Sequence, residues 1–290
     1  MITLNGYNVT PTTFPDTCTQ VWKLPEDVYN KMKITFNNVI EWDFDKESEL
    51  ITIAQLRFMI GSVSEKLGTL RINYLPYGRQ DKEVSNDSTF GIHPFAHLIN
   101  SLNFSTVYLI DAHSDKHGIA NCINEIPYKY IQTVTLLTGT DVLIYPDKGA
   151  SVRYSKLNSL TNIPSIYFNK VREQSTGKIL SLEADSLYPI TNKKCLIVDD
   201  ICDGGATFIQ CAKQLYKMGA SEVYLYTTHG IYSRGSLVLF EEGIKRVFNF
   251  KGEVEWLIFW RVFLLYCYWR YSQRLVLKFQ QVMLVLRFTY

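Results

Sequence analysis

The chain has 290 residues, of which 47% are hydrophobic and 20% charged, and its formal net charge is +2. This length suits one large domain or two modest ones, each with a buried core. A charge so close to neutrality, with no Lys/Arg-rich run, argues against a nucleic-acid-binding protein. The six cysteines form no C-x-x-C pair, and the first residues, MITLNGYNVT, lack the features of a secretory signal. We therefore expect reduced thiols and a cytoplasmic protein.

The N-terminal part is expected to contain short, irregular strands. Segments at 9–14, 20–24 and 33–39 suggest short strands with polar turns between them. A helix is predicted over 49–67, because apolar residues recur there every three or four positions and Gly68 follows its end.

A strand is predicted over 69–75, and the breakers at 76–78 end it. Arg79, Gln80 and Asp81 follow directly. An arginine at a strand end has forked donors that can contact a phosphate group. The alternative is a solvated polar loop.

A second helix and strand are predicted over 91–102 and 106–111. His93 and His97 are four residues apart on this helix, but no glutamate follows His93, and we expect two ordinary surface histidines rather than a zinc pair. His113 follows the strand. A single histidine at a strand end is more often structural than metal-binding, so its role depends on its context.

Two further strands are predicted over 142–145 and 165–168, each followed by charged residues. Asp147 lies in the Pro-Asp-x-Gly turn after the first of these strands. Lys170 and Arg172 follow the second of these strands, where the residues alone indicate a basic surface loop.

The most informative stretch joins a strand at 195–198 to a helix that ends at Gly219. Asp199 and Asp200 are expected at the end of the strand, and a glycine-containing turn at 202–207 opens the helix. Free N–H groups at a helix N-terminus suit a phosphate, and the carboxylates suit ribose hydroxyls or a magnesium ion. The alternative is an ordinary strand-to-helix turn with exposed aspartates.

The C-terminal residues 251–290 differ from the rest of the chain. They are apolar and aromatic, but arginines interrupt them too soon for a membrane-spanning helix. An interfacial amphipathic helix is one interpretation. We favour the other, an anomalous tail that is not a selected fold element, for example the product of a shifted reading frame.

Strands that alternate with helices and carry polar residues at their C-terminal ends predict an α/β fold with ligands at the carboxyl edge of a parallel sheet. Two such domains fit the chain, at 1–140 and 141–250, and a final strand is predicted over 222–228.

Several motifs resemble the ribose-phosphate diphosphokinases (PRPP synthetases) over roughly residues 50–248. The run 198–207 is similar to the PRPP loop of type I phosphoribosyltransferases and of these synthetases, with Ala206 in place of a usual glycine. PYGRQD at 76–81 resembles the segment that leads into the synthetase ATP site. DAHSD at 111–115 resembles the D-x-H-[AS]-D element. The segment 169–172 resembles the catalytic flexible loop of the synthetases, with K-V-R in place of K-R-R, and this resemblance implies a mobile loop whose cations close over a transferring phosphoryl group.

This resemblance implies two phosphoribosyltransferase-like domains, each with a mainly parallel sheet flanked by helices. The first would bind ATP and the second ribose 5-phosphate, with Mg²⁺ as the cofactor. The implied reaction gives AMP and PRPP for nucleotide or NAD synthesis. The implied roles are ATP binding by Phe14, Asp16, Arg79, Gln80 and Asp81, ribose 5-phosphate binding by Asp199, Asp200, Asp203, Gly204, Gly205, Ala206 and Thr207, metal binding by His113 and Asp147, and catalysis by Lys170 and Arg172.

Two other functions stay open at this point. A type I phosphoribosyltransferase, which consumes PRPP, needs the same PRPP loop but not Arg79, His113 or Lys170. A non-catalytic regulatory relative is the second, since Val171 and Ala206 depart from the family pattern. The resemblance to the synthetases also implies a homo-oligomer, and we expect no binding to nucleic acid or to a membrane.

Overall fold

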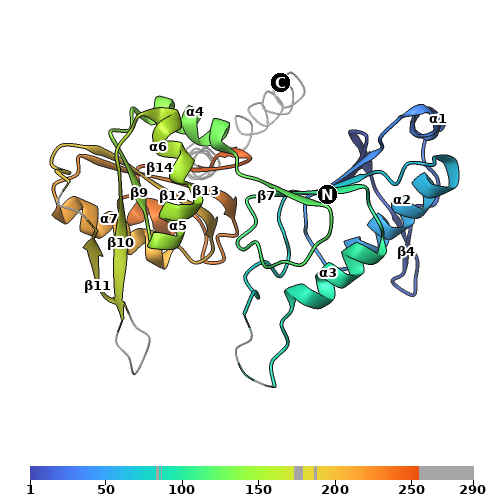
Figure 1. Cartoon of the computed structure of the whole chain (residues 1–290), viewed down its shortest axis with the longest axis horizontal. Coiled ribbons are helices and arrows are strands. Elements are labelled where there is room, and N and C mark those ends of the chain that lie inside the picture. The colour runs from blue at the N-terminus through green and yellow to red at the C-terminus, as the bar shows by residue number, and fades with distance from the viewer. Residues whose placement is uncertain (83–84, 86, 173–178, 186–187, 255–290) are drawn as a thin grey trace, which may run out of the picture. The chain divides into compact units, whose positions relative to one another are not determined.

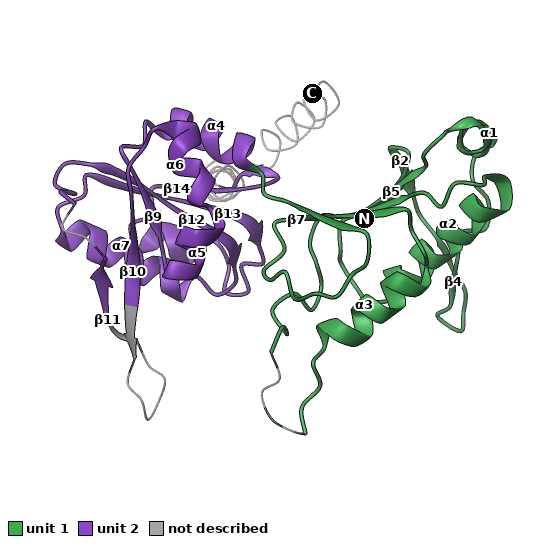
Figure 2. Cartoon of the chain, viewed as in Figure 1, with its two compact units in different colours: residues 1–127 green, residues 128–290 purple. Residues whose placement is uncertain are grey.

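The protein folds as two compact units, which Figure 2 shows in separate colours. The computed structural model describes residues 1–82, 85, 87–172, 179–185 and 188–254. Unit 1 is Met1–Pro127, and unit 2 begins at Tyr128. This division falls before the boundary expected at residue 140, because helix α4 (Tyr128–Thr138) packs within unit 2. Gln132 Nε2 on this helix donates a hydrogen bond to Leu160 O at 3.0 Å.

Unit 1 is built on a six-stranded sheet in the order β2-β1-β5-β6-β7-β8. Figure 1 labels β7 of this sheet. The strands are β1 (Ile2–Leu4), β2 (Tyr7–Val9), β5 (Val39–Trp42), β6 (Thr69–Ile72), β7 (Thr106–Ile110) and β8 (Cys122–Glu125). Strands β5 to β8 are parallel, whereas β1 pairs antiparallel with β2 and β5. Helix α2 (Glu49–Val63) connects β5 to β6, and α3 (Ile92–Ser101) connects β6 to β7. A separate two-stranded ribbon consists of β3 (Thr12–Thr13) and β4 (Thr19–Gln20).

Helix α1 (Glu26–Ile34) overlaps the run 33–39, for which the sequence pattern predicts a strand. That prediction is wrong, since the next strand begins only at Val39. The helix starts after Pro25, with acidic residues in its first turn and Lys31 and Lys33 in its last. These charges interact favourably with the dipole at both ends and stabilise the helix, an effect that apolar periodicity does not reveal.

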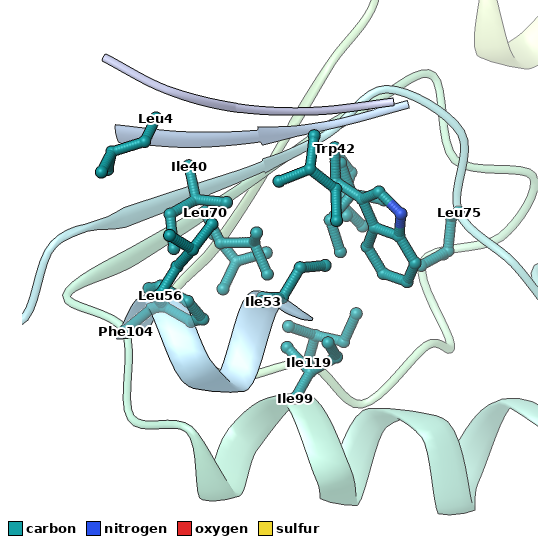
Figure 3. Close-up of a cluster of buried hydrophobic side chains, with 14 of the residues drawn as sticks. Leu4, Ile40, Trp42, Ile53, Leu56, Leu70, Leu75, Ile99, Phe104 and Ile119 are labelled. Carbon is teal, nitrogen blue, oxygen red and sulfur yellow. The ribbon is translucent and has the colours of Figure 1, made fainter. Parts of the chain in front are cut away.

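The core of unit 1 lies between the sheet and helices α2 and α3. In Figure 3 Ile40 and Leu70 extend from the strands, while Ile53 and Leu56 extend from α2. Trp42 is fully buried beside them. Its indole Nε1 donates a hydrogen bond to Glu49 Oε2 at 2.8 Å, which satisfies the one polar atom of this large side chain.

Unit 2 is built on a seven-stranded sheet in the order β11-β10-β9-β12-β13-β14-β15. The strands are β9 (Val142–Tyr145), β10 (Ser165–Arg172), β11 (Ile179–Ala184), β12 (Lys194–Cys202), β13 (Glu222–Gly230), β14 (Arg246–Asn249) and β15 (Gly252–Glu253). Besides α4, its helices are α5 (Lys148–Arg153), α6 (Ser155–Thr161), α7 (Ala206–Lys217) and α8 (Leu237–Glu241). Five adjacent strands are parallel, namely β10, β9, β12, β13 and β14, and the two outer strands, β11 and β15, are antiparallel to them. The expected α/β class, with mainly parallel sheets flanked by helices, is confirmed.

The chain winds in two directions from the centre of this sheet. From β9 it passes through α5 and α6 to β10 on one side, and from β12 it passes through α7 to β13 on the other. Because such crossovers are right-handed, α5 and α6 cover one face of the sheet and α7 the opposite face. β9 and β12 are neighbours, and their carboxyl ends form the switch point where open α/β sheets bind ligands.

The sheet of unit 2 extends into the segment 251–290 that the sequence pattern sets apart. Gly252 and Glu253 form β15, and both carboxylate oxygens of Glu253 accept hydrogen bonds from Arg246, at 2.6 and 2.7 Å. The rest of this segment, 255–290, lies outside the described residues. Within the described ranges no helix has the length and apolar character to cross a bilayer.

Leu56 offers a test of the unit 1 core. Its side chain is fully buried, whereas Phe58 on the same helix is 80% exposed. We expect Leu56→Ala to lower the free energy of unfolding by about 2–5 kcal/mol, because it leaves a cavity. Phe58→Ala should change it by less than about 1 kcal/mol. Urea unfolding checks both variants, and equal losses would contradict this core.

Candidate active site

Asp199 and Asp200 lie on β12 beyond the end of its neighbour β9. The pairing of β12 with β9 stops at Ile197 and Ile144, but its pairing with β13 continues to Cys202 and Gly230. The strand predicted to end at residue 198 therefore continues to Cys202, because β13 extends alongside it. The two aspartates stand on a strand that is flanked on one side only, at the switch point.

Asp147 joins them from the adjacent strand. It follows β9 and caps α5, where its Oδ1 accepts a hydrogen bond from the Ala150 N–H at 3.0 Å. The negative charge of Asp147 raises the pKa of Asp199. We call Asp147, Asp199 and Asp200 the carboxylate cluster.

The carboxylate cluster shifts the ionisation of Asp199. Burial raises the pKa of Asp199 well above its ordinary value, and the charges of Asp200 and Asp147 raise it further. The Asp200 N–H donates to Asp199 Oδ1 at 3.0 Å, which favours the ionised form, but this effect is smaller. A bound cation or several hydroxyl donors would lower this pKa again.

Arg153 supplies a positive charge to the cluster. Its Nη2 lies 3.9 Å from Asp200 Oδ2, and the Asp200 side chain is only 6% exposed. The arginine lies at the end of α5, the helix that Asp147 caps. The sequence pattern places Arg153 on a helix after the Pro-Asp-x-Gly turn, but no motif assigns it a role.

The glycine loop (203–207) follows β12 and leads into α7. Gly205 has a φ of +77°, in the left-handed region that favours glycine, and it accepts a hydrogen bond from the Ile209 N–H at 3.0 Å. Ala206, which replaces a usual glycine, is the first residue of α7 and is exposed, so no glycine is required for its backbone. The N–H groups of the first helical turn remain available to an anion.

Lys170 and Arg172 lie on β10, not on a loop after it. Their backbones pair with β11, Lys170 with Leu182 and Arg172 with Ile179, with a register shift between Val171 and Arg172. The prediction of a loop at 169–172 is therefore wrong. The antiparallel partner β11 extends the strand beyond the apolar run. Residues 173–178 lie outside the described residues.

Arg79 and Gln80 follow β6 in unit 1, and both are exposed. The Gln80 N–H donates to Tyr77 O at 2.8 Å, which closes a turn. Gln80 lines a pocket of about 380 Å³ with Tyr77 and Phe95. Asp81 is half-buried beside this pocket and does not line it.

Phe14 and Asp16 lie in the turn between β3 and β4. Asp16 Oδ1 accepts a hydrogen bond from the Cys18 N–H at 3.1 Å, and the Phe14 ring packs edge-on against Trp22. Phe14 lines a second pocket of about 580 Å³, which shares no lining residue with the pocket of Gln80. The two segments expected to bind ATP are thus separate within unit 1.

His113 follows β7 and is exposed. The backbone before it is held by the Ala112 N–H, which donates to Asn124 Oδ1 at 2.9 Å. The metal site expected at His113 and Asp147 stays a prediction, because the two residues belong to different units.

The carboxylate cluster has the donor chemistry of a magnesium site. Among the described residues no group of three or more His, Cys, Asp or Glu side chains is arranged to hold a metal ion by itself. Magnesium is usually bound by one or two carboxylates together with substrate phosphates and water, rather than by a complete protein cage. The carboxylates here fit that sparse mode of binding.

Two glycines with nearly the same φ angle test the packing of the glycine loop. A Cβ on Gly205 would lie 2.7 Å from Leu239 Cδ2, whereas one on Gly235, with φ +78°, would meet no atom within 4 Å. We expect Gly235→Ala to lower the free energy of unfolding by about 1–2 kcal/mol through backbone strain. Gly205→Ala should cost about 1–3 kcal/mol more through overpacking. Equal losses in thermal unfolding would show that the loop can move away from Leu239.

Comparisons with known proteins agree with this geometry. A family model described as the phosphoribosyl transferase domain matches residues 111–259. A ribose-phosphate pyrophosphokinase of Saccharolobus solfataricus is 25% identical over 210 residues, which are 70% of this chain and 71% of that protein. A ribose-phosphate pyrophosphokinase of Pyrococcus abyssi is 28% identical over 173 residues, which are 57% of this chain and 58% of that protein.

The phosphoribosylpyrophosphate synthetase of Mycobacterium smegmatis has a similar fold. Its crystal structure superposes with a TM-score of 0.60 at 21% identity, over 72% of this chain and 70% of that chain. The family model covers more than half of the 290 residues, and the named relatives are those that the sequence motifs predict. The chain therefore belongs to the phosphoribosyl transferase domain family.

Proposed function

We propose that this protein transfers the diphosphoryl group of MgATP to the anomeric hydroxyl of ribose 5-phosphate, giving AMP and PRPP. The observation that carries this proposal is the carboxylate cluster beside the glycine loop, at the carboxyl edge of β9 and β12. One site there offers donors for a phosphate and acceptors for sugar hydroxyls. The names of the two relatives support the same reaction.

The sugar phosphate would be held by the residues of unit 2. The N–H groups of the glycine loop donate to the 5-phosphate, and Asp199 and Asp200 accept hydrogen bonds from the ribose hydroxyls. These contacts remove the disorder of the free substrate and aim its anomeric oxygen at the nucleotide. The sugar hydroxyls also relieve the repulsion within the cluster, because they donate to the ionised carboxylates.

The reaction forms one bond and breaks one. The anomeric oxygen attacks the β-phosphorus of ATP, and the bond between that phosphorus and the α,β-bridging oxygen breaks, so that AMP leaves with this oxygen. The hydroxyl proton passes to solvent. Little covalent chemistry is required of the protein, so positioning and charge dominate the rate.

Arg79, Gln80 and Asp81 would bind the nucleotide, with Phe14 and Asp16 as further ATP contacts. Gln80 is the member of this set that lines a pocket with aromatic walls. A planar base fits such a pocket, and the exposed guanidinium of Arg79 suits phosphate oxygens.

Magnesium, when bound, neutralises the polyphosphate and fixes its shape. Asp147 and His113 would hold it together with substrate oxygens. Lys170 and Arg172 would stabilise the charge that develops on the transferring group. We further propose that the protein works in the cytoplasm as a homo-oligomer and binds neither nucleic acid nor a membrane.

The direct test is to incubate the protein with ATP, ribose 5-phosphate and Mg²⁺ and to follow the products by phosphorus NMR. We expect AMP and PRPP in equal amounts, because the reaction forms one of each. Consumption of added PRPP in the presence of a base would instead favour the type I phosphoribosyltransferase. Folded protein without either reaction would favour the regulatory relative.

Lys170 separates catalysis from binding. Lys170→Ala should lower kcat by more than about 100-fold and change the ATP dissociation constant by less than about threefold, because the cation acts on the transition state. Lys156→Ala, which removes an exposed lysine on α6, should leave both unchanged. Equal losses of turnover and ATP affinity in Lys170→Ala would contradict this role.

A further inference from the structure

The loop that follows β13 is anchored to the start of the glycine loop. The N–H groups of Ile231 and Tyr232 both donate to Cys202 O, at 2.8 and 3.2 Å. Cys202 is the last residue of β12 and directly precedes the glycine loop. A turn at 232–235, closed by the Gly235 N–H and Tyr232 O at 2.7 Å, then positions Ser233 and Arg234. Two segments that lie far apart in the sequence thus meet at one point of the sheet edge.

Arg234 lies across the bare Cα of Gly204. A Cβ added to Gly204 would come within 3.2 Å of Arg234 Cδ, 3.6 Å of its Cγ and 3.8 Å of Ser233 Oγ. The side chain therefore packs against the glycine loop, and its guanidinium begins at the next atom beyond Cδ. The absence of a side chain at Gly204 lets this cation approach the loop so closely.

The guanidinium of Arg234 is available for a ligand. Arg234 is exposed, and within the described part of the chain it forms neither a hydrogen bond nor an ion pair. The aliphatic part of this side chain holds the cation beside the N-terminus of α7, where it raises the local positive potential. An arginine in this position presents several donors in one plane, which match the oxygens of a phosphate.

We propose that Arg234 binds the 5-phosphate of the sugar phosphate seated at the glycine loop, with Ser233 Oγ as a second donor. This inference rests on the proposed function, since it takes ribose 5-phosphate as the ligand. Backbone N–H groups supply partial charges, and Arg234 adds a full positive charge to the same seat. The residue makes the site selective for a sugar that carries a dianionic phosphate. It is a binding residue that touches no reacting atom, so its loss raises KM more than it lowers kcat.

The test is calorimetric binding of ribose 5-phosphate, without ATP, to four forms of the full chain. These are the unsubstituted protein, Arg234→Gln, Arg234→Lys and the control Lys217→Gln. Lys217 is an exposed lysine at the far end of α7, so the control removes the same charge away from the loop. We expect Arg234→Gln to weaken binding at least tenfold, Arg234→Lys to recover part of the loss, and Lys217→Gln to stay within twofold.

Several results would overturn the inference. Equal affinity of Arg234→Gln and the unsubstituted protein for ribose 5-phosphate would show that Arg234 does not contact this ligand. If Arg234→Gln also lowers the ATP affinity or the unfolding temperature, the role of Arg234 is structural. If it lowers only the affinity for inorganic pyrophosphate, Arg234 binds another anion. A chain that binds no ribose 5-phosphate also overturns it. If binding depends on Arg234 but MgATP yields no AMP, the proposed reaction fails and the inference about Arg234 stands.

Discussion

The repulsion among three carboxyl groups at one sheet edge is the constraint on which the site depends. Asp147, Asp199 and Asp200 come from two neighbouring strands, and burial together with mutual repulsion raises the pKa of Asp199. Such a cluster is unfavourable until donors or cations reach it. Arg153 meets part of this requirement at 3.9 Å from Asp200. A sugar with vicinal hydroxyls and a magnesium ion would meet the rest of this requirement. Ligand binding would thus relieve the repulsion among the carboxylates that remains after folding.

Unequal strand lengths create the place for this cluster. β12 and β13 each have nine residues and pair to their ends, whereas β9 has four and stops earlier. The carboxylates thus stand on a rigid strand that is open on one side. The same strand leads into the glycine loop, and the loop after β13 returns Arg234 to it. The acceptors for sugar hydroxyls and the donors for a phosphate are therefore both positioned by β12. This shared strand is how a rigid sheet orients a flexible sugar phosphate.

Local patterns predicted the parts of the site that depend on neighbours in sequence. The strand, the aspartates, the glycine loop and α7 follow one another directly, and the apolar run and the helix period identify them. Three other features depend on partners elsewhere in the chain. The length of β12 depends on β13, and the position of Lys170 on β10 depends on β11. The position of Arg234 depends on its contact with Gly204. Helix α1 was missed for a different reason. Charged residues at its two ends stabilise it, and a pattern of apolar residues does not reveal such a helix.

A crystal structure of the protein with ribose 5-phosphate and Mg²⁺ tests the central claim most directly, because it locates the sugar without relying on turnover. The account predicts the 5-phosphate within hydrogen-bond distance of the N–H groups of the glycine loop and the ribose hydroxyls against Asp199 and Asp200. A sugar phosphate bound elsewhere would contradict it. So would one whose phosphate occupies the glycine loop while its ribose points away from the carboxylate cluster.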